Sequence, residues 1–446
     1  MAIAEPIVPD KVAPKHKEAM AGAYFWLTAF YLVYCARPED WIPGLKYAPL
    51  AKIAGIFAFL GLLLSIGKSK RGLKHLPKEA LYLLLLIGLL FISAMFSPVW
   101  KGGAFFRTLD FAKVYVAWVL TLLVVTNFER LRRVIYIQAG SVAVISVVTV
   151  LKGRTHYRLT GVLGGIYSNP NDLAFAVVLS IPLCLAFFLC ARGALRKLVW
   201  VVCMLCMATA LFQTASRGGF ITLIVSGAVC LWHFAVKGRR MYLAVIAVLV
   251  AVIVGAIAGK GLRDRFFAIS GEDLDTRHEF SAYNSYEERQ ELMLKAVEAM
   301  VHYPILGIGM RNFTNYSGHW REVHMSYLQI GAEGGFPGLI LYVLFFACGF
   351  SNLRKLRKVK NLDPEVVLFI GALHSSLVGF VVGAFFSPEA YQYFPYFAVA
   401  YTAVLLMIVK EGQKKTEAVS GNPPARPVNA EIGLTRRRTS PEYVSR

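Results

Sequence analysis

Long apolar runs recur along the whole chain and limit what it can fold into. Most are about 17 to 25 residues long, enough for an α-helix to cross a hydrocarbon layer roughly 30 Å thick. Only 17% of the 446 residues are charged, whereas soluble domains carry about 25%. We predict an all-α, polytopic integral membrane protein with about twelve spans, at 21–35, 47–66, 79–96, 109–125, 131–151, 172–189, 198–214, 219–236, 241–258, 326–350, 366–386 and 391–409.

The positive charge is concentrated in alternate connections between these spans. The formal net charge is +21, but its distribution indicates membrane topology and argues against a nucleic-acid partner. The positive-inside rule places the basic connections and both termini in the cytoplasm. The connections concerned are 68–78, 130–133, 192–197, 237–240 and 354–360. The long segment 259–323 is therefore expected on the opposite, external side.

Three parts follow from this pattern. We predict a cytoplasmic N-terminal segment at 1–20, a transmembrane domain at 21–410, and a Pro- and charge-rich tail at 411–446 that is disordered. The first twenty residues are polar and contain several prolines, so the first span is expected to be an anchor rather than a cleaved signal peptide.

The external segment 259–323 carries the signature of an amphipathic helix. Ser285 and Glu288 have the spacing of a capping box, which predicts a helix start there. Apolar residues then recur at helical spacing until Pro304 would end the helix; they are Leu292, Met293, Ala296, Val297 and Met300. Arg289 lies one turn before this stripe and is expected to project with it toward the membrane surface.

Charged groups near membrane spans are costly and call for a partner or a ligand. Arg217 lies between two apolar spans in the sequence Ser216-Arg217-Gly218-Gly219. We interpret it as an anion clamp at a helix N-terminus, and snorkelling to lipid headgroups is the alternative. His324 lies at the mouth of a span, where a neutral imidazole can accept a proton from a hydroxyl group.

No motif in the sequence predicts a bound metal or nucleotide. HExxH and P-loop patterns are absent, so we expect no cofactor. Asp110 and Lys113 lie one helical turn apart and are expected to form an ion pair.

Several of these features stand in an order that resembles the O-antigen ligase and polymerase superfamily of bacterial membrane glycosyltransferases. The resemblance covers roughly 161–338. It is carried by Gly165 to Ala174, Ser216 to Gly219, Arg289 on a loop helix, Pro304 to Gly309, His324 with Leu328, and Glu333 to Gly335.

The resemblance implies a metal-independent, inverting transfer of a glycan from undecaprenyl pyrophosphate to an acceptor hydroxyl, on the periplasmic side of the inner membrane. Arg217 and Arg289 would bind the pyrophosphate, and His324 would orient or deprotonate the acceptor. Arg311 and Arg321 are further pyrophosphate candidates. Glu389 matches an acidic position of the family in location and would lie on the acceptor side. The expected partners are a lipid-linked donor, a lipid or glycolipid acceptor such as lipid A-core, and membrane lipids.

Two other functions stay open. A polymerase of the same superfamily would transfer to another lipid-linked repeat instead of a lipid A-core sugar. A secondary transporter of an anionic solute would also suit about twelve spans. However, the candidate polar groups gather on the external side rather than at the midplane, and no inverted repeat is visible.

Overall fold

The computed structural model describes residues 20–42, 44–65, 71–72, 76–152, 165–167, 169–258 and 277–420. Regular structure in these residues is helical, without a β-strand, which confirms the predicted fold class. The N-terminal segment up to residue 19, the start of the external segment at 259–276, and the tail from residue 421 lie outside the described residues.

Each predicted span overlaps at least one described helix, and a crosswise helix follows the ninth span. The elements are α1 (Ala21–Ala36), α2 (Pro38–Trp41), α3 (Leu50–Ser65), α4 (Lys78–Phe96), α5 (Lys101–Val124), α6 (Phe128–Lys152), η3 (Gly165–Tyr167), α7 (Pro170–Cys190), α8 (Ala194–Gln213), α9 (Arg217–Leu231), η4 (Trp232–Val236), α10 (Tyr242–Ala258), α12 (Arg277–His302), α13 (Phe313–Ser317), α14 (Ser326–Arg357), α15 (Pro364–Gly383), η5 (Glu389–Tyr391) and α16 (Tyr393–Ser420).

Length and hydropathy identify eight of the described helices as candidate membrane spans. They are α4, α6, α7, α8, α9 with η4, α14, α15 and α16. Two further apolar helices, at Leu50–Ser65 and Tyr242–Ile253, are shorter. These helices indicate a multi-pass membrane protein, and the total of about twelve spans stays a prediction.

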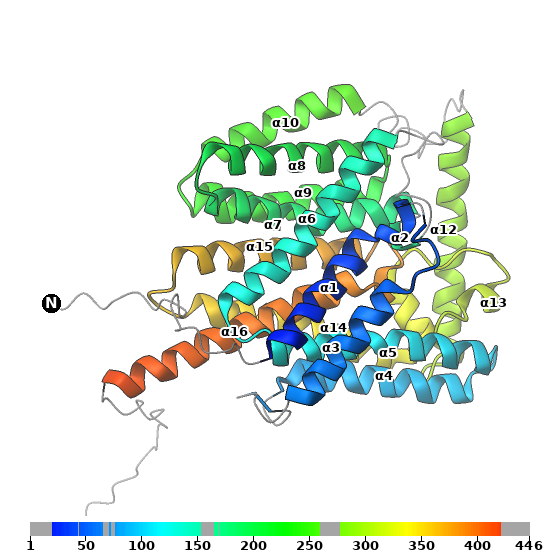
Figure 1. Ribbon diagram of the computed structural model, residues 1–446. Coiled ribbons are helices and arrows are strands. Elements are labelled where there is room, and N and C mark those ends of the chain that lie inside the picture. The colour runs from blue at the N-terminus through cyan, green and yellow to red at the C-terminus, as the bar shows by residue number, and fades with distance from the viewer. Residues whose placement is uncertain are drawn as a thin grey trace, which may run out of the picture.

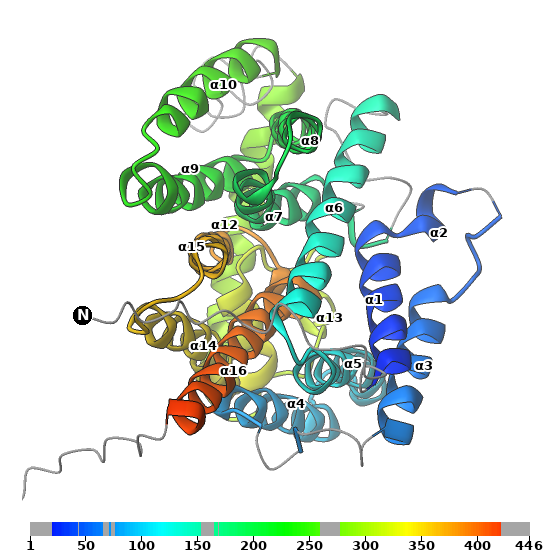
Figure 2. The same ribbon diagram turned by 60° about the vertical axis from the view of Figure 1, so that its left-hand side comes forward.

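The spans form a bundle whose centre is made by α7, α15 and α16. Their apolar windows are 72%, 67% and 83% buried, compared with 33% for α8 and α9. Figures 1 and 2 accordingly show α8, α9 and α10 gathered on one side of the bundle, and α1 with α3 on another. A shared apolar core joins α1, α5, α6, α7, α15 and α16.

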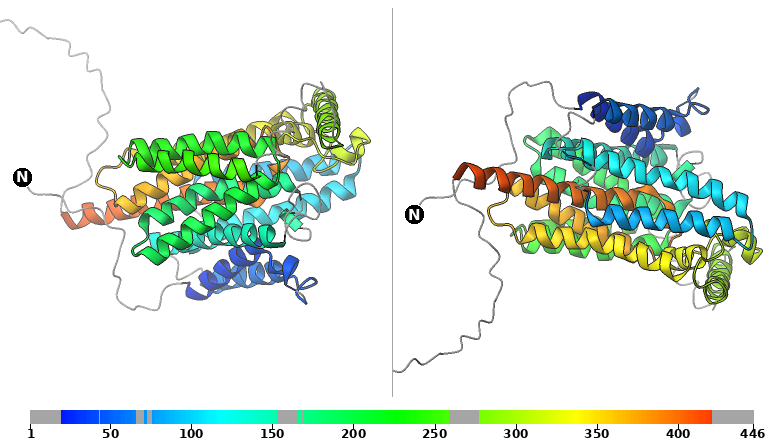
Figure 3. Two further views of the ribbon diagram at one scale, coloured as in Figure 1. Left: turned by 90° about the horizontal axis from the view of Figure 1, so that it is seen from above. Right: turned by 90° about the horizontal axis from the view of Figure 1, so that it is seen from below.

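The two ends of the bundle differ. At one end, α12 lies crosswise over the other helices, and at the opposite end lie the α14–α15 connection and the end of α16 (Figures 1 and 3). The α14–α15 connection carries Lys358 and Lys360, which belong to the predicted cytoplasmic set. The α12 end is therefore the predicted external end.

The last helix continues beyond the predicted domain boundary at Lys410. α16 runs to Ser420, and Arg71 binds Glu411 with its Nε 2.8 Å from Oε1. Arg71 also donates to the carbonyl oxygen of Val125, at the end of α5. The first turns after Lys410 are thus helical and tied to the bundle.

Candidate functional site

The helix α12 is positioned by its apolar side and by polar contacts with the following loop. Leu292, Ala296 and Met300 are buried with Ala299 in a small core that also contains Ile308, Phe313, Val323 and Ala332. Three residues of the predicted stripe therefore pack on the protein itself, whereas Met293 and Val297 are 36% and 45% exposed. The expected direction toward the membrane surface stays a prediction. The predicted helix start is wrong, because α12 begins at Arg277, well before Ser285.

Arg289 is half-buried on α12, at the edge of this small core. The carboxylate of its neighbour Glu288 accepts from Arg321 Nη1, and Arg321 also covers the ring of Trp320. One turn further along, Glu291 Oε1 is 3.1 Å from His319 Nε2. Arg321 thus holds the loop before α14 against α12, in addition to its predicted role as a pyrophosphate ligand.

Two glycine-containing segments cross at close range below α12. Ile308 N donates to Ala332 O over 2.9 Å, and Phe336 N donates to Pro304 O over 2.8 Å. At the crossing, α14 is kinked at Gly335, whose φ is 67°. A Cβ there would lie 2.5 Å from Ile305 O, and a Cβ at Gly307 would lie 2.5 Å from the Glu333 carbonyl carbon. Only glycine allows this crossing, which sets the position of the α14 N-terminus.

Arg217 is the first residue of α9 and is half-buried. The Ser216 side chain caps the helix by accepting from Gly219 N over 3.1 Å, and donates to Asn171 Oδ1 over 2.8 Å. A Cβ at Gly218 would lie 2.5 Å from Phe386 Cβ. The small residues around Arg217 are therefore needed for packing, and they join α9 to the start of α7 and to the α15–α16 connection.

His324 is half-buried in the bend before α14. Two residues later, Ser326 Oγ donates to Ser387 O over 2.7 Å and accepts from Glu389 N over 2.9 Å. The Ser326 amide also donates to Ala384 O over 2.7 Å. These bonds bring together the segment of His324 and the loop of Glu389, two sequence-predicted site residues that lie far apart in the chain.

Glu389 is buried, with a side chain only 4% exposed. Burial, followed by the charge and hydrogen bond of Asp172, raises the pKa of Glu389 well above its usual 4.5; the Ser387 hydroxyl and the Arg311 charge oppose this shift. Ser387 Oγ donates to Glu389 Oε1 over 2.9 Å. Burial and the neighbouring Asp172 carboxylate thus favour the protonated form of Glu389, which can donate a hydrogen bond.

Sequence reasoning missed several carboxyl groups around Arg311. Asp172 lies beside Glu389 and within electrostatic range of Arg311. Glu333 is fully buried on α14 and accepts from Tyr391 Oη over 2.6 Å. Burial raises the pKa of Glu322, against the charges of Arg311 and Arg107. Acidic residues beside apolar spans were the available signal, since charges at such positions are rare without a function.

Glu389 makes the stability of the fold depend on pH. A carboxyl group whose pKa is higher in the folded than in the unfolded protein contributes fully to the free energy of unfolding below its unfolded pKa. This contribution is lost as pH rises through the folded pKa. We therefore expect the melting temperature of the detergent-solubilised wild type to fall as pH rises from the usual carboxyl pKa of 4.5 through the raised pKa of Glu389. Glu389→Gln, which is neutral at every pH, should flatten this profile.

A matched control is Glu287→Gln on α12, because Glu287 is exposed. Its profile should follow the wild type, and a Glu389→Gln profile with unchanged slope would contradict the assignment.

The candidate residues thus lie at the α12 end of the bundle on four elements: α9 (Arg217), α12 (Arg289), the bend before α14 (His324) and η5 (Glu389). The structure joins His324's segment to Glu389 and Arg321 to Arg289's neighbour, and it places Arg311 within electrostatic range of the Asp172–Glu389 pair. That Arg217, Arg289 and His324 border one cavity stays a prediction.

Residues 202–343 match the family model described as O-antigen ligase. The matched segment contains Arg217, Arg289, Arg311, Arg321, His324 and Glu333, and Asp172 and Glu389 lie outside it. No curated protein matches the chain.

Proposed function

We propose that this protein, whose residues 202–343 match the family model described as O-antigen ligase, transfers a glycan from undecaprenyl pyrophosphate to an acceptor hydroxyl at the periplasmic face of a bacterial inner membrane. The supporting observation is that Arg217, Arg289 and His324 all fall within the matched segment and on elements at the α12 end of the bundle.

The reaction needs charge stabilisation on one substrate and proton removal from the other. Arg217 and Arg289 bind the pyrophosphate and stabilise the negative charge that develops on it as the anomeric C–O bond breaks. His324 takes the proton from the acceptor hydroxyl, whose oxygen attacks the anomeric carbon from the opposite side. The electron pair leaves with undecaprenyl pyrophosphate, and the anomeric configuration is inverted.

Glu389 serves the acceptor side in this proposal. Ser326 ties Glu389 to the segment of His324, so a sugar presented to His324 also meets the η5 loop. In its protonated form, which the raised pKa favours, Glu389 donates a hydrogen bond to that sugar without repelling the pyrophosphate.

The arginines give the first test of this function. We expect Arg217→Ala and Arg289→Ala to remain in the membrane but to lose surface glycan attachment. Without a bidentate arginine, the donor pyrophosphate binds more weakly and the negative charge on the leaving group is less well stabilised. Arg217→Lys should restore only part of the activity, since lysine keeps the charge but not the fork. Arg196→Ala, at an exposed position on α8, is the control; normal attachment in both arginine variants would refute the proposal.

A deletion strain separates a ligase from a polymerase of the same superfamily. Long glycans stranded on the carrier lipid are expected for a ligase, whereas the loss of chains longer than one repeat indicates a polymerase. Glycan ladder analysis of the carrier-linked and surface fractions measures both.

A further inference from the structure

Two histidines, His233 and His374, meet near the end of the bundle opposite to the candidate site. His233 belongs to η4 and His374 to α15, and we call them the imidazole pair. His233 Nε2 is 3.0 Å from His374 Nδ1, and the two rings stand edge to face. Arg357, the last residue of α14, has its Nη2 3.1 Å from His233 Nε2. Three elements far apart in the chain thus bring one polar group each to the same point.

Arg357 fixes the hydrogen bonding of the imidazole pair. An arginine side chain only donates hydrogen bonds, so His233 Nε2 accepts from Arg357 and carries no proton. His233 is therefore neutral, and His374 Nδ1 is the donor in the bond between the two rings. Arg357 uses one of its five N–H groups for this contact, and the imidazole pair leaves the others for another partner.

The local backbone of η4 and α15 makes this contact possible. η4 is a π-helical turn, in which Lys237 N donates to Trp232 O over 3.0 Å. Such turns are rare and are frequent at functional sites. α15 approaches η4 at Gly371, where a Cβ would lie 3.2 Å from His233 Cβ and 3.3 Å from Phe234 Cε1. The glycine therefore keeps the two helices close enough for the rings to meet.

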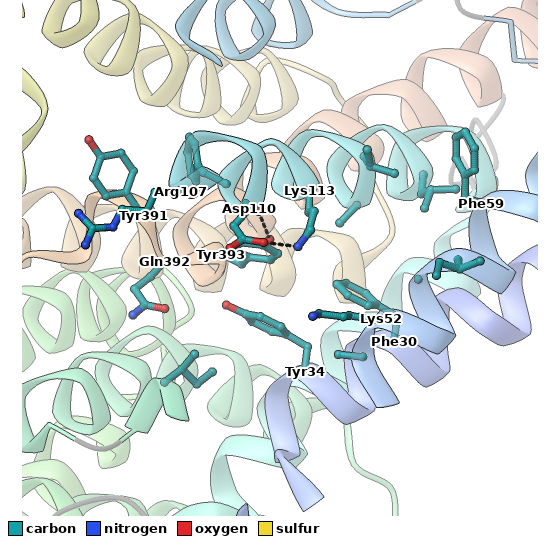
Figure 4. A pocket seen from close by; sticks show the side chains of 18 of the residues that line it. Phe30, Tyr34, Lys52, Phe59, Arg107, Asp110, Lys113, Tyr391, Gln392 and Tyr393 are labelled. Carbon is teal, nitrogen blue, oxygen red and sulfur yellow. Dashed lines mark hydrogen bonds and ion pairs between the residues drawn. The ribbon is translucent and has the colours of Figure 1, made fainter. Parts of the chain in front are cut away.

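Arg357 keeps a positive charge that no carboxylate neutralises. In the groove drawn in Figure 4, by contrast, Lys113 on α5 is bound to Asp110, as the sequence predicts. Arg71 is bound to Glu411 in the same manner. Arg357 is held by a neutral imidazole instead, and it forms no ion pair within the part of the chain that the structure describes. Its side chain is thus held in place while its charge stays available.

Lys237 brings a second positive charge to the same place. It directly follows η4, and its charge and that of Arg357 act on both rings of the imidazole pair. Among the described residues, the charged groups that act on these rings are all cationic. Two neighbouring positive charges repel each other. A bound anion would remove this repulsion, so the cluster is complementary to an anion.

Apolar side chains surround the two cations on the outside of the bundle. Trp232 is 53% exposed, and Lys237 Nζ lies 5.8 Å from the centre of its ring. Tryptophan together with basic residues is typical of the level of the lipid headgroups. Val236, at the end of η4, and Val367, two turns before His374 on α15, are 46% and 52% exposed. A ligand that meets the cations therefore also meets side chains that suit acyl chains.

We propose that Arg357, held by the imidazole pair, and Lys237 bind the phosphate of an anionic phospholipid in the cytoplasmic leaflet. Arg357 donates to the phosphate oxygens with the N–H groups that the imidazole pair leaves, and Lys237 supplies the second cation. The acyl chains lie against Val236 and Val367.

This lipid site is separate from the proposed reaction and does not rest on it. Arg217 is the first residue of α9, whereas η4 follows the last turn of that helix. His324 likewise precedes α14, whereas Arg357 ends it. The length of a membrane span therefore lies between the two sites. The bound lipid joins the ends of α9, α14 and α15 at the surface that is predicted to be cytoplasmic.

Binding of single lipids to the full-length protein in detergent tests the site. Native mass spectrometry counts bound molecules of phosphatidylglycerol, phosphatidylcholine or inorganic phosphate. We expect the first phosphatidylglycerol to bind about tenfold more tightly than the first phosphatidylcholine, whose choline group neutralises its own phosphate. Arg357→Gln should remove this preference, because glutamine can still donate to His233 but carries no charge. Lys237→Gln should reduce it. Both residues are exposed, so the variants should fold.

His233→Phe tests the part played by the imidazole pair. Phenylalanine has a ring of similar size that accepts no such hydrogen bond, so Arg357 would keep its charge and lose its support. We expect the preference for phosphatidylglycerol to fall, but less than in Arg357→Gln. The matched control is Arg196→Gln, which removes the same charge from an exposed position at the start of α8. It should bind all three probes like the wild type.

Four results would contradict this assignment. Equal affinities for phosphatidylglycerol in the wild type, Arg357→Gln and Lys237→Gln would overturn it. An equal loss in Arg196→Gln would mean that diffuse surface charge attracts the lipid. Inorganic phosphate that binds as tightly as phosphatidylglycerol, and is lost in Arg357→Gln, would make the ligand a soluble phosphate. An unchanged preference in His233→Phe would remove the imidazole pair from the site.

Discussion

Replacement of His324 by alanine is expected to lower the rate of glycan transfer by about 10²- to 10⁴-fold, the usual contribution of a general base. The reason is that the acceptor hydroxyl is a poor nucleophile until a neighbouring group takes its proton. His324 lies in the bend before α14, two residues from the serine that fixes the Glu389 loop. Transfer from a lipid-linked donor to a lipid acceptor, measured with purified protein, gives the rate.

The effect should be on the chemical step and not on donor binding. We expect His324→Ala and His324→Gln to lose kcat while the affinity for undecaprenyl pyrophosphate stays near the wild-type value, because the arginines carry that affinity. His319→Ala is the control, since His319 lies on the preceding loop and contacts Glu291 on α12. A wild-type rate in His324→Gln would remove the base assignment and leave the arginine assignment intact.

Gly307→Ala is expected to destabilise the protein strongly. Its φ of 68° alone costs a non-glycine residue about 1–3 kcal/mol. In addition, the new Cβ would lie 2.5 Å from the Glu333 carbonyl carbon, which is backbone and cannot rotate away. Gly335→Ala should behave similarly, because its Cβ would meet Ile305 O at 2.5 Å. The α14 N-terminus would shift in both variants, so activity should fall with stability.

Gly318→Ala separates the cost of the positive φ from the cost of the clash made by the new Cβ. Gly318 has a φ of 71°, but a Cβ there would meet nothing within 4 Å. Gly318→Ala should therefore show only the free-energy cost of the backbone conformation. Its melting temperature in detergent should lie well above those of Gly307→Ala and Gly335→Ala. Equal melting temperatures for the three variants would mean that the crossing is not tightly packed.

The sequence determined the fold class and the position of nearly every long helix. This was possible because a membrane leaves no water for exposed backbone groups, so a sufficiently long apolar run must form a helix whatever its neighbours are. The Asp110–Lys113 pair and the helix end before Pro304 were predictable for a similar reason, since both depend on residues within one or two turns.

The tertiary structure decided which faces and which distant residues meet. The α12 stripe had a helical period, but a period does not say which of its apolar residues pack on protein. In the structure Leu292, Ala296 and Met300 share a core with Val323 and Ala332, whereas Met293 and Val297 are exposed. The start of α12 was predicted wrongly. Ser285 has the spacing of a capping box, but the residues before it are helical too, so Ser285 lies inside the helix and does not begin it.

In the candidate site, too, local sequence identified single residues, and the tertiary structure decided which of them pair. Arg217, Arg289 and His324 could be named from local motifs, because each stands beside glycines, an amphipathic stripe or a span end. The pairing of Asp172 with Glu389, and of Glu333 with Tyr391, could not. These contacts join residues far apart in the chain, and they exist only because α7, α14 and the η5 loop pack together at one end of the bundle.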